Sequence, residues 1–357
     1  MTRIQRLISK MPGQAGAALI TDKFNRLYLT GVLSSAGVLL VTRQGGTLII
    51  DSRYHELAQG TAKGCEVILQ DQLYEQLAGL LTAQGASSLA LESASCTLKA
   101  RDTYREKLDD VRLIEDNWLS DALCELRECK SEEELSKIRA AQKITEQTFE
   151  HLLGFIRPGL TEAEVALEAE FFGRCNGAQG VAFSVIVASG ENSSLPHAVP
   201  GERKLRRGDL LTIDMGFVVE SYCADMTRTM AIGPPSDEQQ KVYNTVLAAQ
   251  GAAFKKIKPG ASCKGVDAAA RQLIDTSPYA GMFGHGLGHS LGLEVHEPPL
   301  AFNKVCETAL RPGMVLSVEP GIYIPGKFGV RIEDLIYVTE NGFENLTTAP
   351  KKLITIN

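Results

Sequence analysis

The sequence has no hydrophobic run long enough to cross a membrane. Its longest apolar stretches, residues 37–41 and 47–50, fall far short of the roughly 20 residues that span a bilayer. Residues 1–11 contain no long apolar segment of the kind that a secretory signal carries. These absences predict a cytoplasmic protein that has no membrane partner.

The sequence also lacks paired cysteines and an excess of positive charge. Its eight cysteines are scattered without a C-x-x-C pair, which argues against a zinc ribbon or a disulfide framework and predicts reduced thiols. The formal net charge is −6, so no overall positive field would attract nucleic acid. A nucleic-acid partner is therefore not expected.

Length and patterning predict a mixed α/β protein of more than one domain. The 357 residues, 44% hydrophobic and 22% charged, are typical of a globular chain with two or three domains. Up to about residue 125, short apolar runs alternate with amphipathic stretches, which favours a layered α/β domain. Ser131 and Glu134 then form an S-x-x-E capping box that opens a helix running towards Phe155. We therefore place a domain boundary between residues 127 and 128.

The second part of the chain carries a faint internal repeat. Residues 156–159 read I-R-P-G and residues 257–260 read I-K-P-G, about a hundred residues later, and an amphipathic helix is expected after each. After the first of them, Thr161 and Glu164 form another capping box. P-G dipeptides end many helices without any duplication. The alternative is a duplicated α/β half, with a functional site between the halves.

Two aspartates stand out in this second part. Asp214 interrupts the strongly apolar segment 210–217, and Asp225 follows eleven residues later. A charge in an apolar strand is costly unless it is paired or binds a metal. Turn-forming residues between the two would let them meet across a hairpin. Taken singly, either aspartate could also cap a turn or pair with Arg228.

Two glutamates repeat the pattern nearer the end of the chain. Glu319 lies in the apolar segment 314–323, and Glu333 lies in the apolar segment 329–338. Each of them alone could be a charge at the end of a strand that faces solvent. Together with the aspartates, they make four carboxylates set in or beside apolar strands.

Histidines gather between these two pairs. The chain has only six, and three of them, His285, His289 and His296, fall among four glycines in residues 284–298. Glycine weakens both helices and strands, so this is not an ordinary core element. Imidazoles serve as metal ligands or proton shuttles. His197 lies in a loop after a predicted strand, where binding residues are common although a lone histidine is usually just solvated.

The combination predicts a two-metal hydrolase. Four carboxylates and one imidazole suit a pair of hard or borderline divalent ions such as Mn, Co, Fe or Zn. Two such ions about 3.5–4 Å apart would activate a shared water and polarise a carbonyl. The predicted site consists of Asp214, Asp225, His289, Glu319 and Glu333.

The order D…D…GHGLGH…HE.P…VEPG…RIED, preceded by the loop S-S-L-P-H, resembles the pita-bread metallopeptidases. It is most similar to their proline-specific branch, the Xaa-Pro dipeptidases and Xaa-Pro aminopeptidases. The resemblance implies an α/β and α+β architecture. A creatinase-like α/β domain would occupy residues 1–127, and a pita-bread catalytic domain with a pseudo-twofold duplication would occupy residues 128–357.

The resemblance also implies a role for each candidate residue. Asp225 and Glu333 would bridge the two ions. Glu319 would move the proton of the attacking hydroxide, while His296 and His197 would act at the reacting centre. His285 would line the substrate pocket, and Arg331 would help to hold the proline side of the substrate. The implied metal ligands are Asp214, Asp225, His289, Glu319 and Glu333.

The expected activity is hydrolysis of the Xaa-Pro bond of dipeptides or of peptide N-termini by a hydroxide that bridges two divalent ions. Mn(II) is favoured, with Co, Zn or Fe as alternatives. The implied partners are short proline-containing peptides and a second copy of the chain in a homodimer. A creatinase-like hydrolase works without metal, and non-catalytic proteins of this fold usually lose ligands. The intact set of five argues against both alternatives, and the choice between dipeptidase and aminopeptidase stays open.

Overall fold

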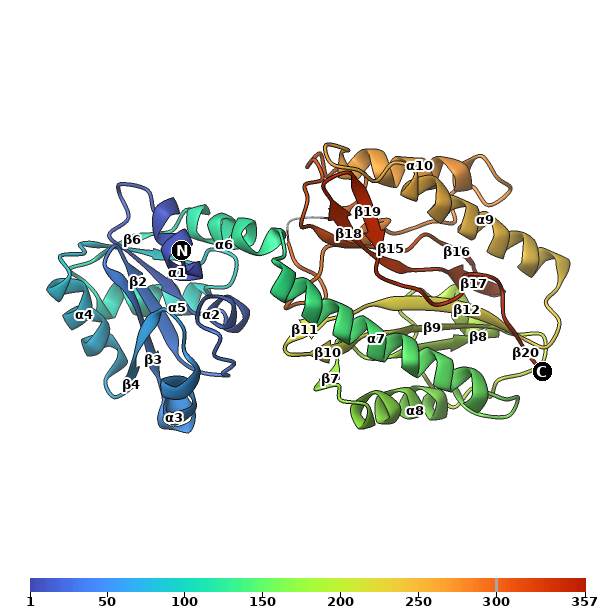
Figure 1. Ribbon diagram of the computed structural model, residues 1–357, viewed down its shortest axis with the longest axis horizontal. Coiled ribbons are helices and arrows are strands. Elements are labelled where there is room, and N and C mark those ends of the chain that lie inside the picture. Colours follow the sequence, from blue (N-terminus) through green and yellow to red (C-terminus); the bar gives the residue numbers. More distant parts are fainter. Residues whose placement is uncertain (299–300) are drawn as a thin grey trace. The chain divides into compact units, whose positions relative to one another are not determined.

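The computed structural model describes residues 1–298 and 301–357 (Figure 1). These residues form two compact units, Met1–Arg127 and Glu128–Asn357. Within the described ranges, no helix combines the length and the apolar character that crossing a membrane requires.

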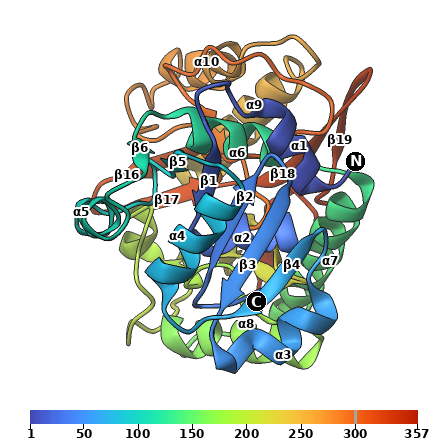
Figure 2. The ribbon, with the colours of Figure 1, turned by 90° about the vertical axis from the view of Figure 1, so that its left-hand side faces the viewer.

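The first unit is a mixed sheet with helices packed around it (Figure 2). Its elements are α1 (Arg3–Lys10), β1 (Ala17–Ile20), α2 (Lys23–Thr30), β2 (Val38–Thr42), β3 (Gly45–Ile50), α3 (Ser52–Thr61), β4 (Cys65–Leu69), α4 (Leu73–Ala83), β5 (Ser88–Leu91), α5 (Leu98–Lys107), β6 (Arg112–Ile114) and α6 (Trp118–Glu128). The strand order is β4-β3-β2-β1-β5-β6. Strands β1 to β3 are antiparallel and the outer pairs are parallel.

The connections and the burial of this sheet follow from its sequence pattern. A short turn joins β2 to β3, whereas the parallel pairs β3–β4 and β5–β6 are connected through α3 and α5, because parallel strands need a crossover. All four residues of the central strand β1 are buried, which explains their continuous apolar run. Leu19, Leu40 and Leu89 meet in the core of this unit. The predicted layered α/β domain is confirmed.

The second unit contains two pairs of helices and several short sheets. Its helical elements are α7 (Glu132–Phe155), α8 (Glu162–Cys175), the 3-10 turn η1 (Gly190–Ser194), α9 (Asp237–Phe254) and α10 (Cys263–Asp275). Its strands are β7 (Gly180–Val181), β8 (Ile186–Ser189), β9 (Leu210–Met215), β10 (Phe217–Val219), β11 (Tyr222–Cys223), β12 (Met226–Ile232), β13 (Gly288–His289), β14 (Ala301–Phe302), β15 (Val315–Val318), β16 (Gly321–Ile324), β17 (Phe328–Arg331), β18 (Asp334–Thr339), β19 (Gly342–Asn345) and β20 (Thr355–Ile356).

The capping boxes predicted from the sequence begin the first helix pair. Ser131 and Glu134 cap α7, which ends at Phe155 as expected, and Thr161 and Glu164 cap α8 in the same way. In each box the hydroxyl accepts a backbone N–H of the first turn and the glutamate reaches back to the N–H of the cap residue, so two otherwise unpaired donors are satisfied.

The two helix pairs lie on opposite sides of the strands (Figure 1). Helices α7 and α8 share one hydrophobic core with β8, β9 and β12. Helices α9 and α10 share another with β15, β16, β17 and β18. The strands that carry the candidate site residues therefore stand between two separately packed layers.

The backbone supports the duplication suggested by the two P-G dipeptides. Gly159 and Gly260 both have positive φ, 96° and 82°, which glycine adopts without strain. The N–H of Gly159 donates to Leu205 O at 2.9 Å, and the N–H of Gly260 donates to Leu310 O at 2.8 Å. The same glycine turn thus precedes both helices, and in both places a later segment of the chain accepts the N–H of the glycine. The second unit is built from two similar halves.

Arg228 links the two halves. This side chain is 1% exposed, and its Nη2 lies 2.8 Å from Oδ1 of Asp334, which is fully buried. Its nitrogens also donate to the carbonyl oxygens of Glu333, Ala349 and Pro350. The alternative in which Asp214 or Asp225 pairs with Arg228 is therefore wrong, because Asp334 makes that ion pair. Since Arg228 lies on β12 and its partners follow β17, it joins strands of both halves.

We predict that Arg228→Ala lowers the free energy of unfolding by about 3–5 kcal/mol, because the buried carboxylate of Asp334 then keeps only Lys351 as a counter-charge and buried carbonyl oxygens lose their donor. The matched control is Arg139→Ala. Arg139 pairs with Glu344 through side chains that are 42% and 45% exposed, so its loss should cost less than about 1 kcal/mol. Urea unfolding of both variants at equal metal load measures the difference, and equal midpoints would show that Arg228 does not join the halves.

Candidate metal centre and active site

The two aspartates lie at the same end of one antiparallel strand pair. Asp214 is on β9, Asp225 directly precedes β12, and the register pairs Met215 with Met226. Gly216 makes this approach possible, because a Cβ at that position would overlap the carbonyl oxygen of Ala224. Between the two strands the chain runs through the β10–β11 hairpin and turns back at Glu220 and Ser221, which both have positive φ. Both carboxylates are consequently buried among apolar strand residues.

The two glutamates occupy the matching place in the second half. Glu319 directly follows β15, and Glu333 directly precedes β18, whose register pairs Val318 with Asp334. The backbone N–H of Glu333 donates to Thr227 O at 3.1 Å. The Thr227 hydroxyl donates to Oε2 of Glu333 at 2.7 Å. These two bonds bring the ends of the two strand pairs together.

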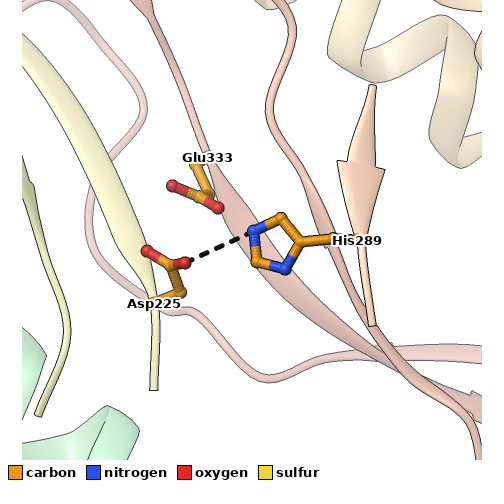
Figure 3. Close-up of side chains that lie close together, drawn as sticks. All are labelled: Asp225, His289 and Glu333. Atoms are coloured by element: carbon orange, nitrogen blue, oxygen red, sulfur yellow. Dashed lines mark ion pairs between the residues drawn. The ribbon is translucent and has the colours of Figure 1, made fainter. Parts of the chain in front are cut away.

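His289 reaches the carboxylates from a short strand beside β15. Gly288 allows this strand to approach, since a Cβ there would overlap Ser317 O. Nε2 of His289 lies 3.5 Å from Oδ2 of Asp225 and 3.5 Å from Oε1 of Glu319. Its Nδ1 lies 3.4 Å from Ser290 O, an arrangement that leaves Nε2 facing the carboxylates. Figure 3 shows the imidazole pointing at Asp225, with Glu333 beside them.

The donor atoms fit a divalent cation. One ligand atom each from Asp225, His289 and Glu333 lies within 4.8 Å of the other two. Oδ1 of Asp214, Oδ1 of Asp225 and Oε1 of Glu333 are buried and have no hydrogen-bond partner among the described residues. A buried acceptor without a donor is costly, and a buried carboxylate more so. Oxygen and imidazole donors without a thiolate suit Mn, Fe, Co or Zn.

The protein alone does not neutralise this cluster. Burial, followed by repulsion from Glu333, Asp214 and Glu319, raises the pKa of Asp225 well above its ordinary value. Burial, followed by repulsion from Glu319 and Asp214, does the same to the pKa of Glu333. Burial also raises the pKa of Glu319 to about 8, partly opposed by the positive charge of Arg331. These carboxyls therefore hold protons where no cation replaces them.

Arg331 is the cation that the chain itself supplies. Its Nη2 donates to Oδ2 of Asp214 at 2.7 Å, and its Nε donates to the Thr227 hydroxyl at 3.0 Å. Its Nη1 donates to Pro196 O at 3.1 Å and to the Tyr323 hydroxyl at 2.9 Å. The guanidinium is 4% exposed. Four of its hydrogen bonds are thus made within the protein, and one of them orients a candidate metal ligand.

His285 is held in the same chain of hydrogen bonds. Burial lowers its pKa to about 4, so the ring is neutral at physiological pH. Nδ1 lies 2.7 Å from Gly286 O, and Nε2 lies 2.9 Å from the Tyr323 hydroxyl. Nδ1 therefore donates to the carbonyl and Nε2 accepts from the tyrosine. Both ring nitrogens have protein partners, which points to a supporting role for this histidine.

All nine residues singled out from the sequence line one cavity of about 430 Å³. Phe183, Ile186 and Val295 add apolar wall. The rings of His289 and His296 lie 4.0 Å apart, and burial lowers the pKa of His296, with His197 adding to the effect. The predicted residues in the cavity are His197, Asp214, Asp225, His285, His289, His296, Glu319, Arg331 and Glu333.

Two contributors to the site, Thr227 and Tyr323, were not predicted. Thr227 bonds to Glu333 and Arg331, and Tyr323 joins Arg331 to His285. A threonine or tyrosine inside an apolar strand is typical of an ordinary sheet residue. The only signal in the sequence is their position, two residues after one candidate carboxylate and four after another.

Residues 136–340 match metallopeptidase family M24, and residues 3–128 match the creatinase/prolidase N-terminal domain. The chain belongs to metallopeptidase family M24. Its second unit is accordingly a pita-bread domain, and its first unit is a creatinase-type N-terminal domain, as the sequence predicted.

Relatives match over nearly the whole chain. The Xaa-Pro dipeptidase of Pyrococcus horikoshii is 36% identical, and the match covers 99% of this chain and 98% of that protein. The structure of an Xaa-Pro dipeptidase from Bacillus anthracis is 39% identical with a TM-score of 0.94, covering 99% of each chain. The structure of an X-Pro aminopeptidase from Thermotoga maritima is 36% identical with a TM-score of 0.91, covering 99% of this chain and 100% of that one.

We predict that the metal-free protein becomes less stable as the pH rises from about 6.5 to 8. The folded-state pKa of Glu319 is about 8 and those of Asp225 and Glu333 are also raised, so the folded state binds more protons than the unfolded state in this range. The lowered pKa of His289 acts in the opposite sense, but only below its ordinary value of 6.5. Thermal unfolding of chelator-treated protein should show a fall of several °C, since ~1 kcal/mol shifts Tm by about 2–4 °C.

Restoring Mn(II) should remove this pH dependence and raise Tm, because cations then replace the protons. In the absence of metal, the Tm of Glu319→Gln should fall less steeply with pH than that of the wild type, since one titrating group is missing. If the Tm of the metal-free wild type did not change with pH, the pKa values of these carboxyls would not be raised in the folded state, which would contradict the prediction.

Proposed function

We propose that this protein is a dinuclear-metal exopeptidase that hydrolyses the Xaa-Pro bond of dipeptides or of peptide N-termini. The observation that carries the proposal is the convergence, in one cavity, of His289 and three carboxylate oxygens that have no hydrogen-bond partner among the described residues. Three further histidines line the same cavity. The residues that would hold two ions, favoured as Mn(II) with Co, Zn or Fe as alternatives, are Asp214, Asp225, His289, Glu319 and Glu333. Ions bound there would polarise the scissile carbonyl and acidify a water that they share.

Glu319 is placed to move the proton of the reaction. It borders the cavity, its Oε1 accepts a hydrogen bond from Ser317 at 3.2 Å, and the same oxygen lies 3.5 Å from Nε2 of His289. A carboxylate held beside the attacking water can take up its proton and later release it. Glu319 would take the proton of the attacking water and deliver it to the proline nitrogen, which cannot leave as an unprotonated anion.

The histidines of the cavity would bind and orient the peptide. Because its pKa is lowered, His296 is neutral and can donate a hydrogen bond to the scissile carbonyl oxygen as negative charge develops there. His197 lies on a loop at the cavity and would orient the substrate beside the scissile bond. An Xaa-Pro bond has no N–H and a locked ring, so recognition needs contacts to the carbonyl and to the pyrrolidine surface.

Arg331 and His285 belong to the proposed substrate site as supports. Arg331 would act on the proline side by holding Asp214 and the carbonyl of Pro196, the neighbour of His197. His285 would keep Tyr323 in place against Arg331. We further propose that the creatinase-like domain comprises residues 1–127, and that the protein is a cytoplasmic homodimer. The cytoplasmic location is inferred from the short apolar runs of the sequence, and the homodimer is inferred from the family resemblance.

The Mn(II)-loaded protein should cleave Xaa-Pro dipeptides and leave the matched Xaa-Ala dipeptides intact. Glu319→Gln should lower kcat by about 10²–10⁴-fold, the usual contribution of a general acid–base group. His296→Ala should lower it by about 10²–10³-fold, the usual loss of one oxyanion donor. The measurement is steady-state kinetics with metal content determined for each variant, and Arg139→Ala serves as an exposed control. Near wild-type rates in both variants would overturn the assignment.

Chain length is tested in the same assay. The relatives include both dipeptidases and an aminopeptidase, so Xaa-Pro and Xaa-Pro-Xaa-Xaa substrates are compared directly. Cleavage of the dipeptide alone indicates a pocket that is closed behind proline. Cleavage of both substrates indicates an open one.

A further inference from the structure

Glu162 is a fully buried carboxylate at the start of α8, outside the metal centre. Its Oε1 accepts from the backbone N–H and the hydroxyl of Ser189, both at 2.7 Å. The amide nitrogen of Asn192 lies 3.2 Å from Oε1 and 3.1 Å from Oε2. Oε2 also accepts from the N–H of Gly201 at 3.4 Å. One carboxylate therefore binds both ends of the segment 189–201.

This segment, which we call the His197 loop, is also fixed at its middle. The N–H of Gly329 donates to the Ser193 hydroxyl at 2.8 Å, and Arg331 donates to Pro196 O at 3.1 Å. On the other side of His197, Ala198 is buried. His197 thus projects from a loop whose middle rests on β17 and whose two ends are tied to Glu162.

We propose that Glu162 is a positioning residue that holds His197 at the cavity by closing the two ends of the His197 loop on α8. The inference rests on the proposed function, in which His197 orients the substrate. It adds a residue that touches neither the peptide nor a candidate metal ligand.

The chemistry of the partners explains why a carboxylate stands here. The N–H groups of Ser189 and Gly201 and the amide nitrogen of Asn192 can only donate. Arg203 donates to the Ser189 hydroxyl at 2.6 Å, so that hydroxyl directs its own hydrogen to Glu162. All of these donors are satisfied only if both terminal atoms of the side chain at position 162 are acceptors. An amide of the same shape would set its NH₂ group against an N–H donor.

The second half of the domain shows that the start of the helix does not itself require this carboxylate. The N–H of Glu162 donates to Arg203 O at 3.0 Å, and in the other half the N–H of Cys263 donates to Thr308 O at 2.9 Å. The same backbone arrangement thus starts α10 with a thiol side chain at that place. What distinguishes the first half is the loop that the carboxylate binds.

The decisive test is a double-mutant cycle between Glu162 and His197 in the Mn(II)-loaded protein, with an Xaa-Pro dipeptide as substrate. Glu162→Gln should lower kcat/KM at least tenfold without changing the metal content. In a His197→Ala background the same substitution should have little further effect on kcat/KM, because the residue it positions is gone. An equal loss in both backgrounds, or no loss in either, would overturn the proposal.

Glu164→Ala is the matched control for helix stability. Glu164 lies on the same turn of α8, but it is exposed, and its carboxylate accepts from the N–H and the hydroxyl of Thr161, at 2.7 and 3.0 Å. Its loss should lower Tm while leaving kcat/KM within about twofold, since it removes only a cap interaction. A tenfold loss in this variant would mean that any damage to α8 lowers activity.

Amide hydrogen exchange tests the loop without relying on activity. Glu162→Gln should speed exchange across residues 189–201 relative to both the wild type and Glu164→Ala. If the wild type cleaves no Xaa-Pro substrate, the proposed function fails while this measurement still decides whether Glu162 closes the loop. Should Glu162→Gln not fold, Asn192→Ala removes a partner of both oxygens and should produce the same two effects at smaller size. Unchanged exchange would contradict the proposal.

Discussion

Mutual repulsion among four neighbouring carboxylates, three of them buried, is the constraint around which the second domain is arranged. Asp214 and Asp225 end one strand pair, and Glu319 and Glu333 stand at the end of the other. Charges placed so close together in a dry interior demand opposite charge nearby. Arg331 supplies one positive charge to Asp214, while three carboxylate oxygens have no donor among the described residues. Divalent cations bound to this cluster would complete the charge balance, and they would then contribute both to the stability of the domain and to its chemistry.

The duplication explains how such a costly cluster can be built at all. Each half contributes one helix pair, one hydrophobic core and one pair of carboxylates. Neither half has to bury all four charges by itself. The junction is made by polar groups of β12, where Thr227 contacts Glu333 and Arg228 pairs with Asp334. Bonds between the halves therefore lie immediately beside the candidate metal centre.

The candidate metal ligands could be singled out in the sequence because their signal is local. A carboxylate inside an apolar run and a histidine among glycines are both unusual wherever they occur. The sequence also predicted the layered N-terminal domain, helix α7 and the capping boxes, since periodicity and caps depend on neighbouring residues. Supports such as Thr227 and Tyr323 gave no such signal, because they look like ordinary strand residues until the partner strands are in place.

Glu162 and His285 are two further residues whose roles depend on contacts that the sequence does not reveal. An acidic residue in the first turn of a helix is what the helix dipole favours, so Glu162 appears unremarkable until residues 189–201 fold back onto it. The resemblance implied that His285 lines the substrate pocket. It does border the cavity, and the structure adds that both of its ring nitrogens have protein partners. Residue type and spacing locate a site, whereas the division of labour within it depends on long-range hydrogen bonds.

Arg331 connects the candidate metal centre to the His197 loop. Its guanidinium holds Oδ2 of Asp214 with one nitrogen and the carbonyl of Pro196 with another. Asp214 belongs to the carboxylate cluster, and Pro196 precedes His197 in a loop whose ends are tied to Glu162. A shift of the guanidinium would therefore move a candidate metal ligand together with the histidine that we propose orients the substrate. Because one planar, permanently charged group makes both contacts, the loop is fixed with respect to the cluster, and the histidine stays in register with the atoms that would carry out the reaction.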